Sequence, residues 1–109
     1  MVTSPGEVYL VDLELAAKSR PMLVVSRKDA DAPRALAICA PITTQYRDSD
    51  YEVSIGRPRF LNESSYVNVQ GLQAIQHHEL KKRLGTLSEE QMIPVRKSLA
   101  FALDLSVEI

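Results

Sequence analysis

Two short segments of the chain combine a restrained backbone with side chains that could bind a ligand. The first is "KSRPMLVVS" at residues 18–26, in which Arg20 directly precedes Pro21. A residue before proline is pushed toward extended geometry, and proline suits the first position of a strand because its missing N–H is not needed by the ladder. Arg20 is therefore predicted to be a cation held at the edge of a rigid element.

The second segment is "APITTQYRDSD" at residues 40–50. A buried strand is predicted to end at Ile42 and to be followed by Thr43, Thr44 and Gln45. Hydroxyl and amide groups at the end of a strand can donate hydrogen bonds to a ligand while the strand holds them in place. The alternative is that the threonines bond only to the local backbone and that Arg20 is a solvated charge.

Short strands must position these two segments. Alternating polar and apolar residues, separated by turn-forming clusters, predict strands at residues 7–13, 21–27, 34–42 and 51–55. Residues 65–76 hold one or two more strands, and Gly71 there marks a bulge or bend. Strands of this length and spacing predict a small barrel-like sheet.

The last part of the chain predicts a helix. Ser88 and Gln91 have the spacing of a capping box. Pro94 predicts either a bent helix or one that becomes regular only after that residue, because an interior proline removes a hydrogen bond. The predicted apolar stripe consists of Met92, Val95, Leu99 and Leu103.

Composition excludes several classes of protein. The 109 residues suffice for one domain, residues 1–109, and its 13 basic and 14 acidic side chains argue against a surface coated in positive charge. The one cysteine, Cys39, is predicted to be a small buried hydrophobe, and two histidines make a poor zinc-ligand set, so we expect no metal or other cofactor. With no signal peptide and no membrane-spanning run, we expect a soluble, cytoplasmic protein.

Taken in order, "GEVYLVDL", "KSRPMLVVS", "AICAPITTQ" and "RLGTLSEEQMIPVRKSLAFALDL" resemble the MazF/PemK (Kid) family of toxin endoribonucleases over nearly the whole chain. The resemblance implies an SH3-like barrel with a C-terminal helix, mainly β in class. It also implies a homodimer that cleaves single-stranded RNA, including mRNA, without a metal. Such toxins are neutralised by a cognate antitoxin of the MazE type.

The resemblance also implies roles for individual residues. The family's essential arginine before proline matches Arg20, and its essential threonine after the third core strand matches Thr43. A guanidinium can bind two oxygens of the phosphate attacked by the neighbouring 2′-hydroxyl, and Thr43 can add one hydrogen bond. The general base is left unassigned, because Gln70 stands where many members have an acidic residue and glutamine cannot act as a base.

Further residues are candidates for contacting RNA. Arg57 and Arg59 stand beside Phe60, and cations next to an aromatic ring suit single-stranded bases, although this loop could instead receive the antitoxin. His77 is another candidate; it cannot act together with His78 on one phosphate if both lie on an extended segment. The remaining candidates are Lys18, Thr44, Gln45, Gln70 and Gln73.

Two other interpretations remain open. A CcdB-like toxin shares the barrel but binds DNA gyrase, and this activity should depend on the terminal helix rather than on Arg20. A barrel without catalytic activity, acting only as a binding module, is the second. Fold alone cannot separate them, because function depends on the site.

Overall fold

A computed structural model describes residues 1–13 and 19–105 of the chain. The described residues form a mainly β structure followed by one α-helix, as the sequence predicts. In chain order the elements are β1 (Glu7–Val11), β2 (Arg20–Val24), β3 (Leu36–Thr43), β4 (Glu52–Gly56), β5 (Ser65–Asn68), the short 3-10 helix η1 (Val69–Gly71), β6 (Gln73–Gln76), a second 3-10 helix η2 (His77–Glu79), β7 (Leu80–Thr86) and α1 (Glu89–Ala102).

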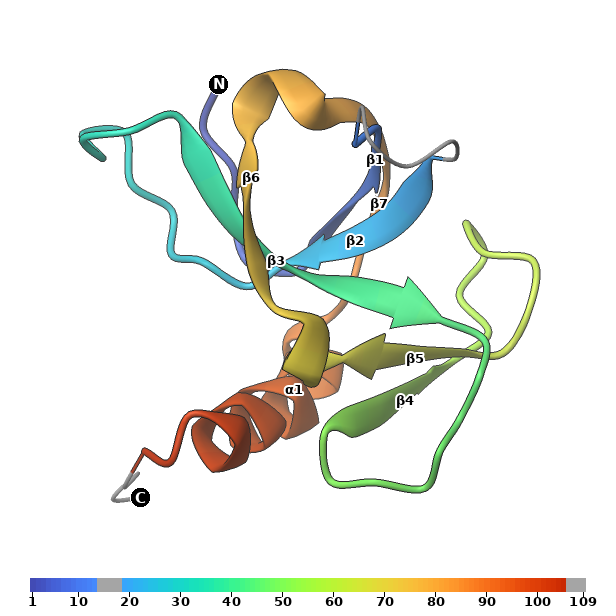
Figure 1. Cartoon of the computed structure of the whole chain (residues 1–109). Helices are drawn as coiled ribbons and strands as arrows, with labels where there is room; N and C mark the ends of the chain where they lie inside the picture. The colour runs from blue at the N-terminus through green and yellow to red at the C-terminus, as the bar shows by residue number, and fades with distance from the viewer. Residues whose placement is uncertain (14–18, 106–109) are drawn as a thin grey trace.

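The strands form one antiparallel sheet in the order β4-β5-β3-β2-β1-β7, and β6 pairs with β3 outside this path. The long strand β3 is central, because it pairs with β2 along one side and with β5 and β6 along the other. Figure 1 shows the sheet bending along β3, with α1 lying across the end formed by β4 and β5. This curvature produces the expected barrel-like shape.

Alternation along β2 shows how the strands build two cores. Leu23 belongs to a cluster that also contains Met92 and Val95 of α1, so this face of the sheet is covered by the helix. Met22 and Val24 point to the opposite face and belong to a second cluster with residues of β1, β3, β6 and β7. Because successive side chains point to opposite faces of a strand, both clusters hold β2 in place.

The predicted strands at residues 7–13, 21–27, 34–42 and 51–55 overlap β1 to β4, with ends that differ by at most three residues. The sequence pattern does not predict strand β7. Its sequence "LKKRLGT" carries three consecutive exposed cations, and its register with β1 shifts twice. These irregularities remove the period-two pattern by which a strand is recognised, while charges of this kind are common on the edge strands of sheets.

The capping box is confirmed: the Ser88 hydroxyl accepts from the Gln91 N–H at 3.2 Å, and the Gln91 side chain accepts from the Ser88 N–H at 2.9 Å. Of the two alternatives for Pro94, the helix that becomes regular only after this residue is wrong, since α1 begins at Glu89 and continues through the proline. The predicted apolar stripe ends early, because Leu103 is 53% exposed. None of the helices in the described ranges is long and apolar enough to span a membrane.

Candidate active site

Arg20 and Thr43 lie next to each other on adjacent strands. Met22 of β2 pairs with Pro41 of β3. Because these strands are antiparallel, extending the register by two residues places Arg20 opposite Thr43, on the same face of the sheet. The guanidinium and the hydroxyl, 23 residues apart in sequence, are thus brought to one place by the β2–β3 ladder.

Both side chains line a cavity of about 430 Å³ at this corner of the sheet. Its lining residues come from β2, β3, β4, β5 and η1 and from the loop between β3 and β4. The other residues that line it are Pro41, Ile42, Gln45, Arg47, Ser49, Tyr51, Glu52, Asn68 and Gln70.

The hydroxyl of Thr43 has one hydrogen bond in the described structure. Its oxygen accepts from the backbone N–H of Gln45 at 3.0 Å. This bond fixes the oxygen but leaves the hydroxyl proton for another acceptor. No described residue accepts a hydrogen bond from the Arg20 guanidinium. Both groups can therefore donate to an anion in the cavity.

The loop beside the cavity is held at several points. The carboxylate of Glu52 accepts from the Arg47 N–H at 3.0 Å and from the Ser49 hydroxyl at 3.2 Å. The buried hydroxyl of Ser98 in α1 donates to the carbonyl oxygen of Asp50 at 2.6 Å. The helix thus fixes the loop that carries several of the polar residues around the cavity.

The structure brings some of the predicted site residues together and separates others. Arg20, Thr43, Gln45 and Gln70 share the cavity. Lys18 lies outside the described residues. The predicted RNA-contacting residues that are described but do not line the cavity are Thr44, Gln73, Arg57, Arg59 and His77.

His77 lies far from the cavity. It follows Gln76, which pairs with Leu36 at the opposite end of β3 from Thr43. At about 3.3 Å per residue, the seven steps from Leu36 to Thr43 follow roughly 23 Å of strand. His77 and His78 belong to the 3-10 helix η2 rather than to the extended segment that the sequence suggested.

The aromatic neighbour of Arg57 and Arg59 is also placed differently from the expectation. Phe60 is only partly exposed and packs against the main core, with its ring over Gly85 of β7. A side chain at position 85 would collide with this ring. Phe60 therefore anchors its loop to the sheet, and one face of its ring is covered.

Sequence reasoning gave no role to several polar residues of the cavity, among them Arg47, Asn68 and Glu52. Arg47 supplies a second cation, Asn68 supplies an amide, and Glu52 is the one carboxylate among the described residues that line it. Arg47 stands in the charged turn after Thr43, but its position depends on how this loop folds back over the sheet.

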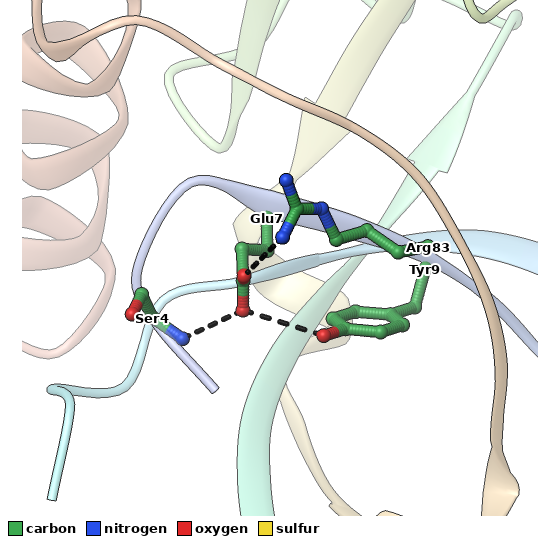
Figure 2. A network of polar contacts seen from close by, with 4 residues as sticks. All are labelled: Ser4, Glu7, Tyr9 and Arg83. Carbon is green, nitrogen blue, oxygen red and sulfur yellow. Dashed lines mark hydrogen bonds and ion pairs between the residues drawn. The ribbon is translucent and has the colours of Figure 1, made fainter. Parts of the chain in front are cut away.

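A second polar cluster lies on β1 and β7, outside the cavity lining. Glu7 is its centre: the carboxylate accepts from the Ser4 N–H at 2.7 Å, the Tyr9 hydroxyl at 3.4 Å and the Arg83 guanidinium at 3.2 Å (Figure 2). Burial raises the pKa of the Tyr9 phenol, and the charge of Glu7 and the hydrogen bond to it act in the same direction.

Comparison with known proteins identifies relatives of the chain. Residues 4–103 match the family model described as PemK-like, MazF-like toxin of type II toxin–antitoxin system. The chain is 30% identical over 88 residues to the Mycobacterium tuberculosis protein named Endoribonuclease MazF3, a match that covers 81% of this chain and 85% of that protein.

Solved structures show the same similarity in three dimensions. A mycobacterial endoribonuclease superposes with a TM-score of 0.82 and 27% identity, covering 97% of this chain and 95% of its own. A mycobacterial endoribonuclease in complex with its cognate antitoxin gives a TM-score of 0.84 at 27% identity, covering 97% and 99% of the two chains. The expected fold, a small β barrel with a C-terminal helix, is confirmed.

Proposed function

The chain belongs to the PemK-like, MazF-like toxins of type II toxin–antitoxin systems, and we propose that it is a metal-independent endoribonuclease acting on single-stranded RNA in the cytoplasm. The observation that carries this proposal is that Arg20 and Thr43, from the adjacent strands β2 and β3, line one cavity. Its mycobacterial relatives are named endoribonucleases.

The proposed reaction uses the RNA's own 2′-hydroxyl. Its oxygen attacks the adjacent phosphorus and loses its proton, while the bond from phosphorus to the 5′-oxygen breaks and that oxygen gains a proton. The products carry a 2′,3′-cyclic phosphate and a 5′-hydroxyl. During this step negative charge increases on the non-bridging phosphoryl oxygens.

Arg20 and Thr43 supply donors for that charge. The guanidinium keeps its charge at any working pH and can contact two phosphoryl oxygens at once. The Thr43 hydroxyl, oriented by the Gln45 N–H, donates a further hydrogen bond. Donors already in place before the reaction are effective because they need not reorganise as the charge develops.

Two protein partners complete the proposal. We expect a homodimer, as the family resemblance implies, and a cognate antitoxin of the MazE type. A similar endoribonuclease has been solved with its antitoxin. An acidic antitoxin segment could cover Arg20 and Arg47 and so exclude RNA from the cavity. A protein that stays monomeric at micromolar concentration in light scattering would contradict the homodimer.

The direct test is incubation of the purified protein with a long RNA of mixed sequence in excess EDTA. Arg20→Ala and Thr43→Ala are tested beside it after circular dichroism has shown that they are folded, and Arg83→Ala is the matched control for loss of a cation. Discrete fragments with cyclic-phosphate ends are expected from the wild type and from Arg83→Ala only. Intact RNA in every lane would contradict the proposal and favour gyrase binding or a binding module. Cleavage only without EDTA would contradict metal independence.

A further inference from the structure

The sheet carries two stacked tyrosines directly beside Thr43. Tyr66 of β5 pairs with Thr43 of β3, so the two residues are lateral neighbours on one face of the sheet, about 5 Å apart as adjacent strands are. The ring of Tyr46, in the loop that follows β3, lies over the ring of Tyr66. Their centroids are 4.6 Å apart and their planes differ by 16°.

This stack presents an open aromatic surface. Tyr66 is half-buried, whereas Tyr46 is 51% exposed although one side of its ring is covered by Tyr66. The Tyr46 hydroxyl donates to the Asp48 carboxylate at 3.0 Å, which fixes the edge of the ring. A large exposed aromatic ring that is held in position loses little conformational entropy when a planar group stacks on it.

The loop that carries Tyr46 is itself fixed. The backbone N–H of Arg47 donates to Glu52, and the carbonyl of Asp50 accepts from Ser98 of α1. Asp48 adopts the left-handed conformation, with φ of 53°. This conformation turns the chain so that its carboxylate meets the hydroxyl of Tyr46.

Charge favours a base over a phosphate at this surface. Tyr46 borders a hollow lined by the carboxylates of Asp50 and Glu52 and the ammonium of Lys97, and Asp48 adds a further carboxylate. The surroundings are therefore net negative and disfavour a phosphate. The guanidinium groups of Arg20 and Arg47 line the neighbouring cavity, which Glu52 also borders.

We propose that the Tyr46–Tyr66 stack binds one RNA base and so positions the nucleotide next to the scissile phosphate. This inference rests on the proposed endoribonuclease function. With the phosphate between Arg20 and Thr43, an adjacent base reaches the stack one strand further along the sheet. Stacking tolerates different bases, so the surface selects for the presence of an unpaired base more than for its identity. Tyr46 and Tyr66 are positioning residues.

The experiment removes the ring and the base separately. Once a cleaved sequence is known, a short RNA spanning the cut is made with each flanking base replaced in turn by an abasic ribose. Cleavage of every RNA is measured with the wild type, Tyr46→Ala and Tyr46→Phe. For the wild type, one abasic position should lower kcat/KM by roughly 5- to 150-fold, the range that stacking on an aromatic side chain contributes.

The combination of the two changes is decisive. Tyr46→Ala should lower kcat/KM on intact RNA by a similar factor. It should cause no further loss when the RNA is abasic at that position, because both changes remove the same contact. Tyr46→Phe should keep most of the wild-type kcat/KM, since the ring remains although its hydrogen bond to Asp48 is lost. If the losses in kcat/KM from Tyr46→Ala and from removal of a base multiply at every position, the stacking inference is wrong and the two tyrosines are merely structural. Failure of the wild type to cleave any RNA would instead overturn the proposed function, and this inference with it.

Discussion

Arg20 and Arg83 stand on the two strands that flank β1, but their guanidinium groups have different surroundings. Arg20 pairs with Val11 on one side of β1, and Arg83 pairs with Tyr9 on the other. Arg83 forms an ion pair with Glu7 at 3.2 Å, and that carboxylate has two further donors. Among the described residues, Arg20 has no such acceptor.

The difference shows how to separate polar groups that stabilise a fold from those available to a ligand. The Glu7 side chain is only 13% exposed, so leaving its carboxylate without donors would cost stability. Arg20 and Thr43 instead line an open cavity, where the guanidinium and the hydroxyl can still donate hydrogen bonds to a ligand. Mutations in the first cluster should therefore change stability, and mutations in the second should change activity.

The largest effect is expected from Arg20→Lys. Lysine keeps the charge but cannot contact two phosphoryl oxygens in the planar geometry of a guanidinium. We expect kcat/KM for RNA cleavage to fall by roughly 10²-fold, comparable to removing one preorganised donor. The free energy of unfolding should stay within about 0.5 kcal/mol of the wild type, as for other exposed positions.

Arg83→Lys is the matched control for this change. A lysine there can still reach Glu7, and it lies outside the cavity lining, so cleavage should be unchanged. Full activity of Arg20→Lys would rule out bidentate phosphate recognition. Equal losses in both variants would show that the flanking arginines do not differ in function.

Glu7→Gln should have the opposite profile. The neutral side chain cannot keep its charge-assisted bonds, so we expect urea denaturation to show a loss of roughly 1–3 kcal/mol in the free energy of unfolding. Cleavage at a temperature where the variant is folded should equal that of the wild type. Glu52→Gln is the control, because this carboxylate accepts its bonds from Arg47 and Ser49 of one neighbouring loop. A larger loss of stability in Glu52→Gln than in Glu7→Gln would contradict the division between groups that stabilise the fold and groups that face a ligand.

The Tyr9 phenol gives the Glu7 cluster a dependence on pH. Its pKa is raised above 10.0, chiefly by burial, so the unfolded chain loses this proton at a lower pH than the folded one. The associated stability is present below about pH 10 and is lost as the pH rises through the folded pKa. Between pH 9 and 11.5, the free energy of unfolding should therefore fall less steeply in Tyr9→Phe than in the wild type.

Cys39 must be removed from that measurement. Burial raises the pKa of the Cys39 thiol to about 12, from 9.0, which gives an alkaline loss of the same sign. The comparison is therefore made in a Cys39→Ala background. Parallel pH curves for the two proteins would show that ionisation of Tyr9 is not linked to folding.

Much of this architecture could be predicted from local sequence signals. Ser88 and Gln91 mark the start of α1 because a capping box acts within one turn of chain. The consecutive residues Arg20 and Pro21 mark the start of β2 for a similarly local reason. The buried state of Cys39 follows from its apolar neighbours, and the structure confirms it.

What could not be predicted depends on contacts between distant residues. Arg47 and Glu52 enter the cavity because a loop folds back and is bonded to α1. The stacking of Tyr46 on Tyr66 depends on the β3–β5 register, which neither segment specifies alone. The sequence also cannot show that His77 lies away from the site, because its place at the far end of β3 follows only from the β3–β6 pairing.

The smallest effect is expected at Arg59, an exposed cation on the Phe60 loop that does not line the cavity. If it contacts only the RNA backbone, Arg59→Ala should weaken binding similarly for all sequences and reduce the slope of log K against log salt by about 1. Fluorescence anisotropy with one labelled RNA at several salt concentrations measures this slope, with Arg57→Ala beside it. Single-turnover cleavage at saturating protein should be unchanged in both variants. A loss of single-turnover rate comparable to that of Arg20→Lys would mean that this loop closes over the reacting phosphate. The catalytic donors would then extend beyond the strand ends that hold Arg20 and Thr43.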